Sequence, residues 1–426
     1  MSRTTKKVKK YKWILTISFI TIIIICIIAG FIVRNNQLQN EMLRKEKLKE
    51  EILNHYNEYV VTNKNSEIYT LNNSKYQKSG KIVKGQELIL EPKDITYEDE
   101  YLKVKTFDNE YYIYYKDVDI IETMNLSDNR YKRYILFNKN VVTANTTNFY
   151  DEEGNLIYTL NQSFNLPIIV NKENIYGVEF NNRLLYVKKE DISEVIDSQN
   201  TKLTNTNGIA VLNYHFFYDE SKQTERDDCN QYICKSKTGF KQHLDYIKNN
   251  NIFTPTMKEF EMYLNKEINL PKSTLITIDD GWRMQIGVDL LEEYQLNATV
   301  FLITSWWEEI NFLNKYKYVE YHSHGDNLHN QGVCPGGQGG AIKCLDKKTL
   351  LEDLSLSRKK LNGTTIFCYP FYEYNNYSIS VLKEAGFTLA FVGGMKKATL
   401  SSDKYQIPRY VMYDQTTVEQ LKSYID

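Results

Sequence analysis

The stretch that most constrains the fold is residues 273–281, STLITIDDG. Its apolar residues stop at two adjacent carboxylates, Asp279 and Asp280, followed by a glycine. A short apolar run bounded by turn residues is typical of a buried strand in a parallel sheet. Ligands and catalytic groups gather at the carboxyl ends of such strands. Because adjacent carboxylates repel each other, the pair predicts a nearby positive charge such as a metal ion. The alternative is a strand-to-helix turn in which one Asp caps the next helix.

Residues 208–426 alternate between strand and helix patterns. Strands are expected at 209–214, 273–278, 297–303, 318–322, 365–369, 387–392 and 407–412, and helices at 238–250, 256–265, 284–295, 346–361, 377–385 and 416–425. This alternation predicts a parallel sheet, either open or closed into a barrel.

Three of the six histidines lie in one short segment, YHSHGDNLH, which follows the expected strand 318–322. We expect them at the same end of the sheet as Asp279 and Asp280. Two imidazoles and one carboxylate, with an open position for water, form a common hydrolytic metal site, and His324 and His329 are spaced to supply the imidazoles. A plain polar loop is the alternative.

An uncharged apolar run occupies residues 13–33. At a rise of about 1.5 Å per residue, a helix of this length spans the hydrocarbon core of a membrane. The basic segment 1–12 should stay in the cytoplasm, which leaves everything after Arg34 outside the cell. We therefore predict a single-pass anchor; a cleaved signal peptide is the alternative.

Between this run and residue 208 the sequence predicts a stalk, two small β modules and a linker. Residues 34–58 have apolar positions at helical spacing, which indicates either a stalk that pairs with a second chain or a solvated single helix. Residues 59–122 and 130–196 have the pattern of short alternating strands, and the two segments end alike. They loosely resemble bacterial SH3-like domains. Such modules would either bind the cell wall or serve as spacers. Residues 197–207 read as a polar linker.

The net charge bears on the kind of partner, and the cysteines bear on disulfides and metal sites. The net charge is −1, so nothing indicates a nucleic-acid partner. Outside the membrane disulfides are allowed, and we predict the pairs Cys229–Cys234 and Cys334–Cys344, each holding a loop beside the site. Cys368 lies on an expected strand and should be a buried free thiol. A cysteine-rich zinc site is the alternative, but the spacings do not fit it.

Four segments in order resemble the carbohydrate esterase family 4 (NodB-homology) polysaccharide deacetylases. They are VLNYHFF at 211–217, TIDDG at 277–281, HSHGDNLH at 322–329 and FCYPFYEYN at 367–375. The resemblance covers about residues 208–426. It implies a distorted (β/α) barrel with a divalent metal ion, for which we expect Zn²⁺, at its mouth.

The resemblance also implies roles for individual residues. Asp280, His324 and His329 would hold the metal ion, and Asp279 would act as the general base. A bound divalent ion lowers the pKa of its water and polarises the acetamide carbonyl, and a carboxylate beside it can accept the proton of the attacking water.

On the same basis Tyr369 and Pro370 would line the substrate groove, and the backbone near Tyr369 would help bind the oxyanion. His215 and Trp282 are candidates for the rim of the site, with a structural hydrogen bond and core packing as their alternatives.

Two departures from the family pattern stand out. Family members usually carry a late histidine that protonates the leaving amine, but no histidine follows His329 here. The late segment contains Arg409 instead, which we expect to orient Asp279 by ion pairing, since a guanidinium is a poor proton donor. The second departure is Tyr372, which stands where the family often has glycine and would narrow the groove or offer a stacking surface to a sugar.

The sequence thus predicts a membrane-anchored, outward-facing, metal-dependent deacetylase that acts on a cell-envelope polysaccharide containing N-acetylglucosamine. Peptidoglycan is the first choice of substrate, because anchor, stalk and β modules would set the height of the catalytic domain within a wall. Poly-N-acetylglucosamine is a close second. The alternatives are an inactive wall-glycan-binding protein and an O-acetyl esterase with the same site.

Overall fold

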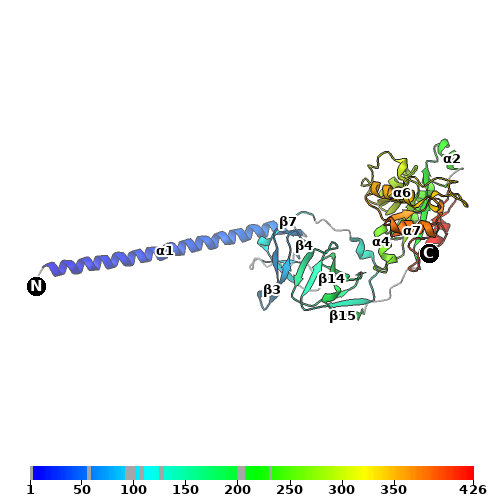
Figure 1. The fold of residues 1–426 in the computed structure, drawn as a ribbon. Coiled ribbons are helices and arrows are strands. Elements are labelled where there is room, and N and C mark those ends of the chain that lie inside the picture. Colours follow the sequence, from blue (N-terminus) through cyan, green and yellow to red (C-terminus); the bar gives the residue numbers. More distant parts are fainter. Residues whose placement is uncertain are drawn as a thin grey trace. The chain divides into compact units, whose positions relative to one another are not determined.

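The structure, a computed structural model, describes residues 3–54, 59–91, 101–104, 110–123, 129–198, 207–229 and 233–426 (Figure 1). The chain separates into two compact units. The first contains Met1–Ser127, Thr143–Phe164 and Glu179–Val187, and the second contains Asp128–Val142, Asn165–Val178 and Lys188–Asp426. Most of the predicted linker 197–207 lies outside the described residues.

The N-terminal segment is one uninterrupted helix, α1 (Arg3–Asn54), drawn in blue in Figure 1. It contains both the predicted membrane span and most of the predicted stalk, whose residues 55–58 lie outside the described part. Ile17–Lys47 is long and apolar enough to cross a membrane, and no residue of its apolar window is buried. The helix is therefore compatible with a membrane anchor. Its orientation, and pairing through the stalk, remain predictions.

The rest of the first unit is β structure. Its strands include β1 (Tyr59–Thr62), β2 (Ser66–Asn72), β3 (Lys75–Ile82), β4 (Glu87–Ile89), β5 (Tyr101–Val104), β6 (Tyr111–Tyr114), β7 (Val118–Ile121), β9 (Thr147–Tyr150) and β10 (Leu156–Leu160). β3 pairs antiparallel with both β2 and β10, and Tyr158 lies opposite Ile82. Strands from the two predicted SH3-like segments therefore share a sheet. The β character is as expected, while the SH3-like identity of the modules remains a prediction.

The second unit contains a seven-stranded parallel sheet in the order β23-β22-β21-β20-β19-β16-β24. Its strands are β16 (Ala210–Tyr214), β19 (Thr274–Ile278), β20 (Ala298–Leu302), β21 (Val319–Ser323), β22 (Ile366–Cys368), β23 (Leu389–Phe391) and β24 (Tyr410–Val411). The sheet curls into a half-barrel, and a parallel bridge joins Phe391 at the end of β23 to Ile407, just before β24. The mixed α/β class is confirmed.

The helices of this unit are α2 (Gln223–Cys229), α3 (Lys237–Asn249), α4 (Met257–Leu264), α5 (Gln285–Tyr294), α6 (Lys347–Lys360), α7 (Asn376–Glu384) and α8 (Val418–Ile425). Every residue of β16, β19 and β20 is buried, which explains why these strands are continuously apolar rather than alternating. Side-chain caps begin several helices where the sequence supplies Thr or Asn; α4, for example, starts with a capping box of Thr256 and Glu259.

Short segments that precede the barrel in sequence also belong to the second unit. They contribute β8 (Lys139–Thr143), β11 (Asn165–Pro167), β12 (Val170–Asn171) and β15 (Ile192–Asp197), with β13 (Ile175–Phe180) and β14 (Arg183–Lys188) at the division between the units. Within the barrel domain, β17 (Phe216–Tyr218) and β18 (Cys234–Ser236) form a separate two-stranded parallel sheet.

An ion pair anchors the first of these segments to the barrel domain. Arg130 binds the carboxylate of Glu259 on α4 with two hydrogen bonds of 3.0 and 2.5 Å, and the hydroxyl of Tyr134 donates to the same carboxylate. Glu259 is buried, so the segment supplies the positive charge that balances its carboxylate.

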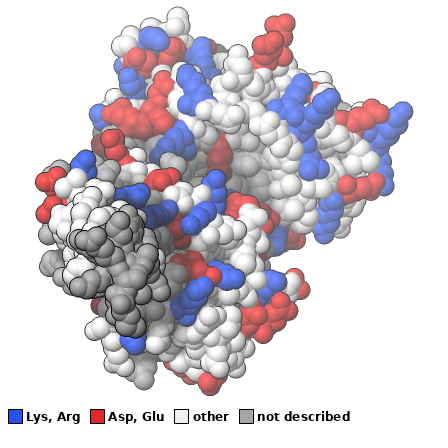
Figure 2. Space-filling view, turned by 90° about the vertical axis from the view of Figure 1, so that its left-hand side faces the viewer, with Lys and Arg blue, Asp and Glu red and all other residues white. Residues whose placement is uncertain are grey.

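Charged side chains are mixed over the molecular surface. In the view of Figure 2, Lys and Arg residues lie among Asp and Glu residues and form no continuous basic stripe on the visible face.

Candidate active site

The two adjacent aspartates turn their carboxylates toward different partners. β19 ends at Ile278, and Asp280 and Gly281 then adopt left-handed backbone conformations, with φ of 69° and 82°. Glycine is required at the second position because a Cβ there would lie 2.5 Å from the Leu302 side chain. The turn leaves Asp279 facing an arginine and Asp280 facing two histidines.

Asp280, His324 and His329 converge as the sequence predicted. The Asp280 Oδ1 atom lies 3.2 Å from His324 Nε2 and 3.4 Å from His329 Nε2. His324 directly follows β21, and His329 lies five residues further along the same loop. One ligand atom from each of the three residues falls within 4.8 Å of the others, so the group could hold a metal ion.

The details of this group fit a cation. Within the described residues Asp280 Oδ1 is buried and has no hydrogen-bond donor, which is costly unless a cation or another donor satisfies it. His324 Nδ1 lies 2.8 Å from the carbonyl oxygen of Cys368. Because a carbonyl only accepts, Nδ1 carries the proton and Nε2 is left as a ligand, which is the usual arrangement for a metal-binding histidine.

The surroundings shift the pKa values of the two histidines in opposite directions, and burial followed by the nearby His324 lowers the pKa of His329. Burial lowers the pKa of His324, but Cys368, Asp280 and Asp279 together raise that pKa well above its usual value. The negative potential that stabilises a protonated imidazole would equally stabilise a bound cation. One carboxylate and two imidazoles are donors that suit zinc.

Asp279 is paired with Arg409 inside the barrel. Arg409 Nη1 donates to Oδ1 at 2.7 Å and Nη2 donates to Oδ2 at 2.8 Å, and the two residues are 0% and 2% exposed. Burial raises the pKa of Asp279, but the guanidinium outweighs burial and holds this pKa below its usual range. Asp279 is therefore an oriented carboxylate. The predicted ion pair is present, although Arg409 and Asp279 are 130 positions apart.

Arg409 is itself held in place by the barrel. Its Nε donates to the carbonyl of Val392 at 3.1 Å, and Nη2 donates to the sulfur of Cys368 at 3.0 Å. Cys368 is a buried free thiol, as predicted. These contacts fix the plane of the guanidinium, and with it the plane of the Asp279 carboxylate.

The predicted groove residues divide between core and cavity. Tyr369 and Pro370 are buried, Tyr369 packs in a core cluster with Phe367, and neither lines the cavity. The Tyr369 N–H donates to the Phe391 carbonyl at 3.1 Å, so that amide is engaged within the sheet. Their predicted role in the substrate groove therefore stays a prediction. Both rings directly follow a strand that is buried on each face, so they pack in the hydrophobic core.

Tyr372 does line the cavity. It has a φ of 61°, so its backbone is in the left-handed conformation. Glycine adopts this conformation readily, but in tyrosine it is strained. Its hydroxyl donates to Asn213 Oδ1 at 2.7 Å and lies 3.4 Å from His215 Nε2. These contacts hold the ring in the wall despite the strained backbone.

The cavity has a volume of about 460 Å³ and contains Asp279, Asp280, His324 and His329 in its lining. The other lining residues are His215, Phe216, Ile233, Trp282, Gln331, Gln338, Phe371 and Tyr372. His215 and Trp282 were candidates from the sequence, whereas Ile233, Phe371 and both glutamines were not. The sequence holds one usable signal for the glutamines, since they lie in the Gly-rich segment directly after His329.

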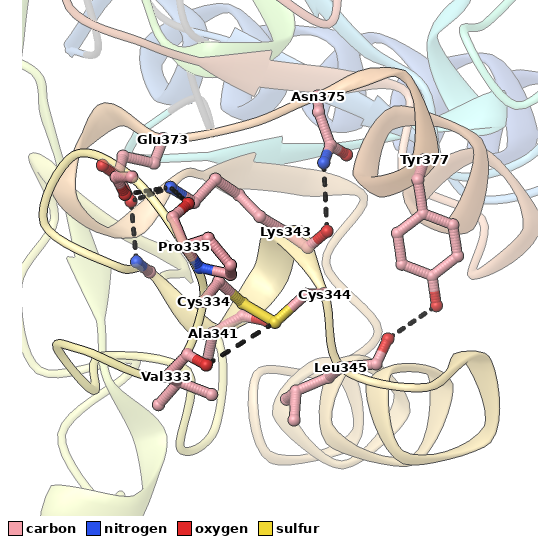
Figure 3. Close-up of a disulfide and its surroundings, with 12 residues drawn as sticks. Val333, Cys334, Pro335, Ala341, Lys343, Cys344, Leu345, Glu373, Asn375 and Tyr377 are labelled. Carbon is pink, nitrogen blue, oxygen red and sulfur yellow. Dashed lines mark hydrogen bonds and ion pairs between the residues drawn. A yellow bond between two sulfur atoms is a disulfide. The ribbon is translucent and has the colours of Figure 1, made fainter.

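Both predicted disulfides are present beside the cavity. Cys229 is joined to Cys234, next to the lining residue Ile233. Cys334 is joined to Cys344 and closes the segment that carries Gln338 (Figure 3).

Residues 266–390 match the family model described as polysaccharide deacetylase. Among known proteins, the chain is similar to poly-beta-1,6-N-acetyl-D-glucosamine N-deacetylases of two staphylococci. It is 26% identical to that of Staphylococcus aureus over 241 residues, which cover 49% of this chain and 80% of the relative. It is 24% identical to that of Staphylococcus epidermidis over 246 residues, or 51% and 83% of the two chains. A solved structure, the Streptococcus pyogenes deacetylase PplD in complex with acetate, aligns with 52% of this chain and 99% of its own at 16% identity and a TM-score of 0.43.

Proposed function

We propose that this chain, a hydrolase with a polysaccharide deacetylase domain that acts on carbon–nitrogen bonds other than peptide bonds, removes acetyl groups from poly-β-1,6-N-acetyl-D-glucosamine outside the cell. The observation that carries the proposal is the convergence of Asp280, His324 and His329 beside the paired Asp279. The names of the staphylococcal relatives support this polymer ahead of peptidoglycan, which the anchor and stalk alone had favoured.

Asp280, His324 and His329 would hold the divalent ion, with zinc as our choice. When bound, such an ion supplies Lewis-acid polarisation of the acetamide carbonyl and makes water more acidic. Asp279 lies beside these ligands and is kept ionised by Arg409, so its carboxylate can accept a proton from the attacking water. Arg409 itself keeps its protons and serves to orient the base.

The leaving amine needs a proton, and no histidine follows His329 to supply it. Asp279 becomes the nearest acid once it has accepted the proton of the water, and it can pass this proton to the sugar nitrogen as the carbon–nitrogen bond breaks. The products are acetate and a free amine. Because Arg409 lowers the pKa of Asp279, it makes this carboxylate a weaker base in the first step and a stronger acid in this second step.

The α1 helix supports a location at the outer face of the cell membrane. Its apolar part is long enough to span the bilayer, and the basic residues before it favour a cytoplasmic N-terminus. The barrel domain would then meet its substrate outside the cell, where the two disulfides are stable.

The test is acetate release by the full chain in detergent, with added zinc, from three substrates: a β-1,6-linked N-acetylglucosamine oligomer, peptidoglycan and an O-acetylated glycan. We expect release from the first, and none from the same protein carrying Asp279→Asn. Release only from peptidoglycan would move the substrate to the cell wall, and release only from the O-acetylated glycan would make the protein an esterase. Binding without release from any of them would favour a glycan-binding protein.

A further inference from the structure

Two side-chain amides in the cavity wall take no part in the chemistry described above. Gln331 and Gln338 belong to the segment 330–344, which we call the Gly-rich loop, and both line the cavity. Among the described residues neither side-chain amide has a hydrogen-bond partner. Each amide therefore offers the cavity both donor hydrogens and an acceptor oxygen.

The Gly-rich loop has a defined structure. Gly332 N–H donates to the Gln338 carbonyl at 2.9 Å, and the N–H groups of Val333 and Cys334 donate to the Gly339 carbonyl at 2.9 and 3.0 Å. The Cys334–Cys344 disulfide closes its base (Figure 3). The position of Gln338 is therefore set before any ligand arrives, which lowers the entropy cost of binding.

Glu373 holds the Gly-rich loop against the cavity wall. Its carboxylate accepts hydrogen bonds from the N–H groups of Gln338 and Gly340 at 2.6 and 2.7 Å, and pairs with Lys343 at 2.9 Å. In Figure 3 the Glu373 side chain points into the loop, and Lys343 lies between it and the disulfide. Because Glu373 directly follows Tyr372, it ties the loop to the wall of the cavity.

The chemistry of the remaining wall fits a sugar polymer. Phe216 and Trp282 line the same cavity, with their ring centroids 4.9 Å apart. Aromatic faces pack against the apolar faces of sugar rings, and amides bind the hydroxyl groups at their edges. The reacting sugar must lie over Asp280 and His329, and Gln331 follows that histidine by two positions.

We propose that Gln331 and Gln338 bind hydroxyl groups of a sugar that neighbours the reacting one, and that the Gly-rich loop thereby makes the enzyme select polymers over single sugars. This inference rests on the function proposed above. Cys334, Cys344 and Glu373 act as positioning residues, since they place the loop and do not touch the substrate.

The test compares a β-1,6-linked pentamer of N-acetylglucosamine with the monomer on the full chain in detergent. Affinity is measured by calorimetry on metal-free protein, where no turnover occurs, and KM and kcat are measured on the zinc-loaded protein. Gln338→Ala should weaken pentamer binding and raise its KM by about threefold to tenfold, the range for one lost neutral hydrogen bond. The kcat, and both constants for the monomer, should stay unchanged.

The paired change Cys334→Ser with Cys344→Ser should affect the pentamer at least as strongly, because it removes the covalent closure of the segment that carries Gln338. Gln242→Ala is the matched control, since Gln242 is an exposed glutamine on α3, and it should change nothing. If the cysteine variant fails to fold, the Gln338→Ala variant alone tests whether the Gly-rich loop binds the neighbouring sugar.

Equal losses on monomer and pentamer, or no loss on either, would overturn the role of the Gly-rich loop. That outcome differs from a failure of the proposed function, in which the unaltered protein releases no acetate from either sugar.

Discussion

The buried polar group of the site, Asp279, His324 and Arg409, contrasts with its exposed wall, Gln331 and Gln338. In the buried group every side chain faces a specific partner, and the Asp279–Arg409 pair is almost completely removed from solvent. In the exposed wall the side chains have no partner among the described residues, and the backbone beneath them is fixed by Glu373 and a disulfide. On the function proposed above, the residues of the chemistry are oriented by direct side-chain partners. The residues of substrate selection are instead presented by a loop whose backbone is fixed.

A change within the buried group should have the largest effect. Asp279→Asn keeps the shape of the side chain but removes its ability to accept a proton. We expect kcat for acetate release to fall about 10³-fold, within the range for loss of a general base, while the protein stays folded. Activity within tenfold of the unaltered protein would show that another group takes the proton. Circular dichroism of the variant provides the control for folding.

Arg409→Lys tests whether orientation by two hydrogen bonds matters beyond charge. The lysine keeps the positive charge that lowers the pKa of Asp279 but cannot form the paired contacts of 2.7 and 2.8 Å. We expect kcat to fall about 30-fold, in line with the sensitivity of catalysis to misplaced groups, and KM to stay the same. A rise in KM with unchanged kcat would instead assign Arg409 to substrate binding.

A second buried histidine, His243, lies outside the site and can be compared with His324. His243 is buried on α3, where its Nδ1 lies 2.9 Å from the Tyr214 hydroxyl and its Nε2 lies 3.0 Å from the Thr416 carbonyl. Burial and then Lys235 lower the pKa of His243 to about 4. His324 is equally buried but has a raised pKa. Two equally buried imidazoles therefore differ in the direction of their pKa shift because of the groups around them, which are Cys368, Asp280 and Asp279 near His324 and Lys235 near His243.

This contrast predicts a pH dependence of stability. The unfolded chain binds a proton on His243 below about pH 6.5, whereas the folded chain does so only near pH 4. Stability should therefore fall as the pH drops from 6.5 to 4, by up to about 3 kcal/mol. Denaturant unfolding of the full chain should show this slope, and His243→Gln should reduce it. An identical slope in the variant would contradict the lowered pKa.

A smaller effect is expected where the segment before the barrel meets α4. Arg130→Met leaves the buried Glu259 with the Tyr134 hydroxyl as its remaining side-chain partner on that segment. The free energy of unfolding should fall by about 2 kcal/mol, less than for a fully buried pair, because Arg130 is partly exposed. Arg133→Met removes the same charge from a neighbouring residue that donates to a carbonyl, and it should cost less than half as much. Equal costs would mean that net charge, not the ion pair, stabilises this contact.

The sequence predicted the elements that depend on local pattern. The apolar run at 273–278 became β19, and the helix expected at 346–361 became α6, because continuous burial and helical spacing are visible in short windows. The four ligand and base candidates could also be named, because each follows a strand of the parallel sheet, while their separate roles were implied by the resemblance to the deacetylase family.

What the sequence could not predict depends on contacts between distant segments. The Gly-rich segment indicates a loop around Gln338, but the place of Gln338 in the cavity wall depends on the Cys334–Cys344 disulfide and on Glu373, which is 35 positions away. The pairing of Arg130 with Glu259 spans 129 positions and joins a segment expected to be a separate module to the barrel domain. Tyr369 was expected in the groove from its place in the family-like motif, and only the fold shows that its ring packs in a core cluster with Phe367.

The central claim is that Asp280, His324 and His329 together hold one divalent ion. Its most direct test is the metal content of the full chain after dialysis against limiting zinc, measured by mass spectrometry alongside the Asp279→Asn and His324→Ala variants. We predict one equivalent in the unaltered protein and in Asp279→Asn, and almost none in His324→Ala. A His324→Ala protein that retains a full equivalent of zinc would contradict the account.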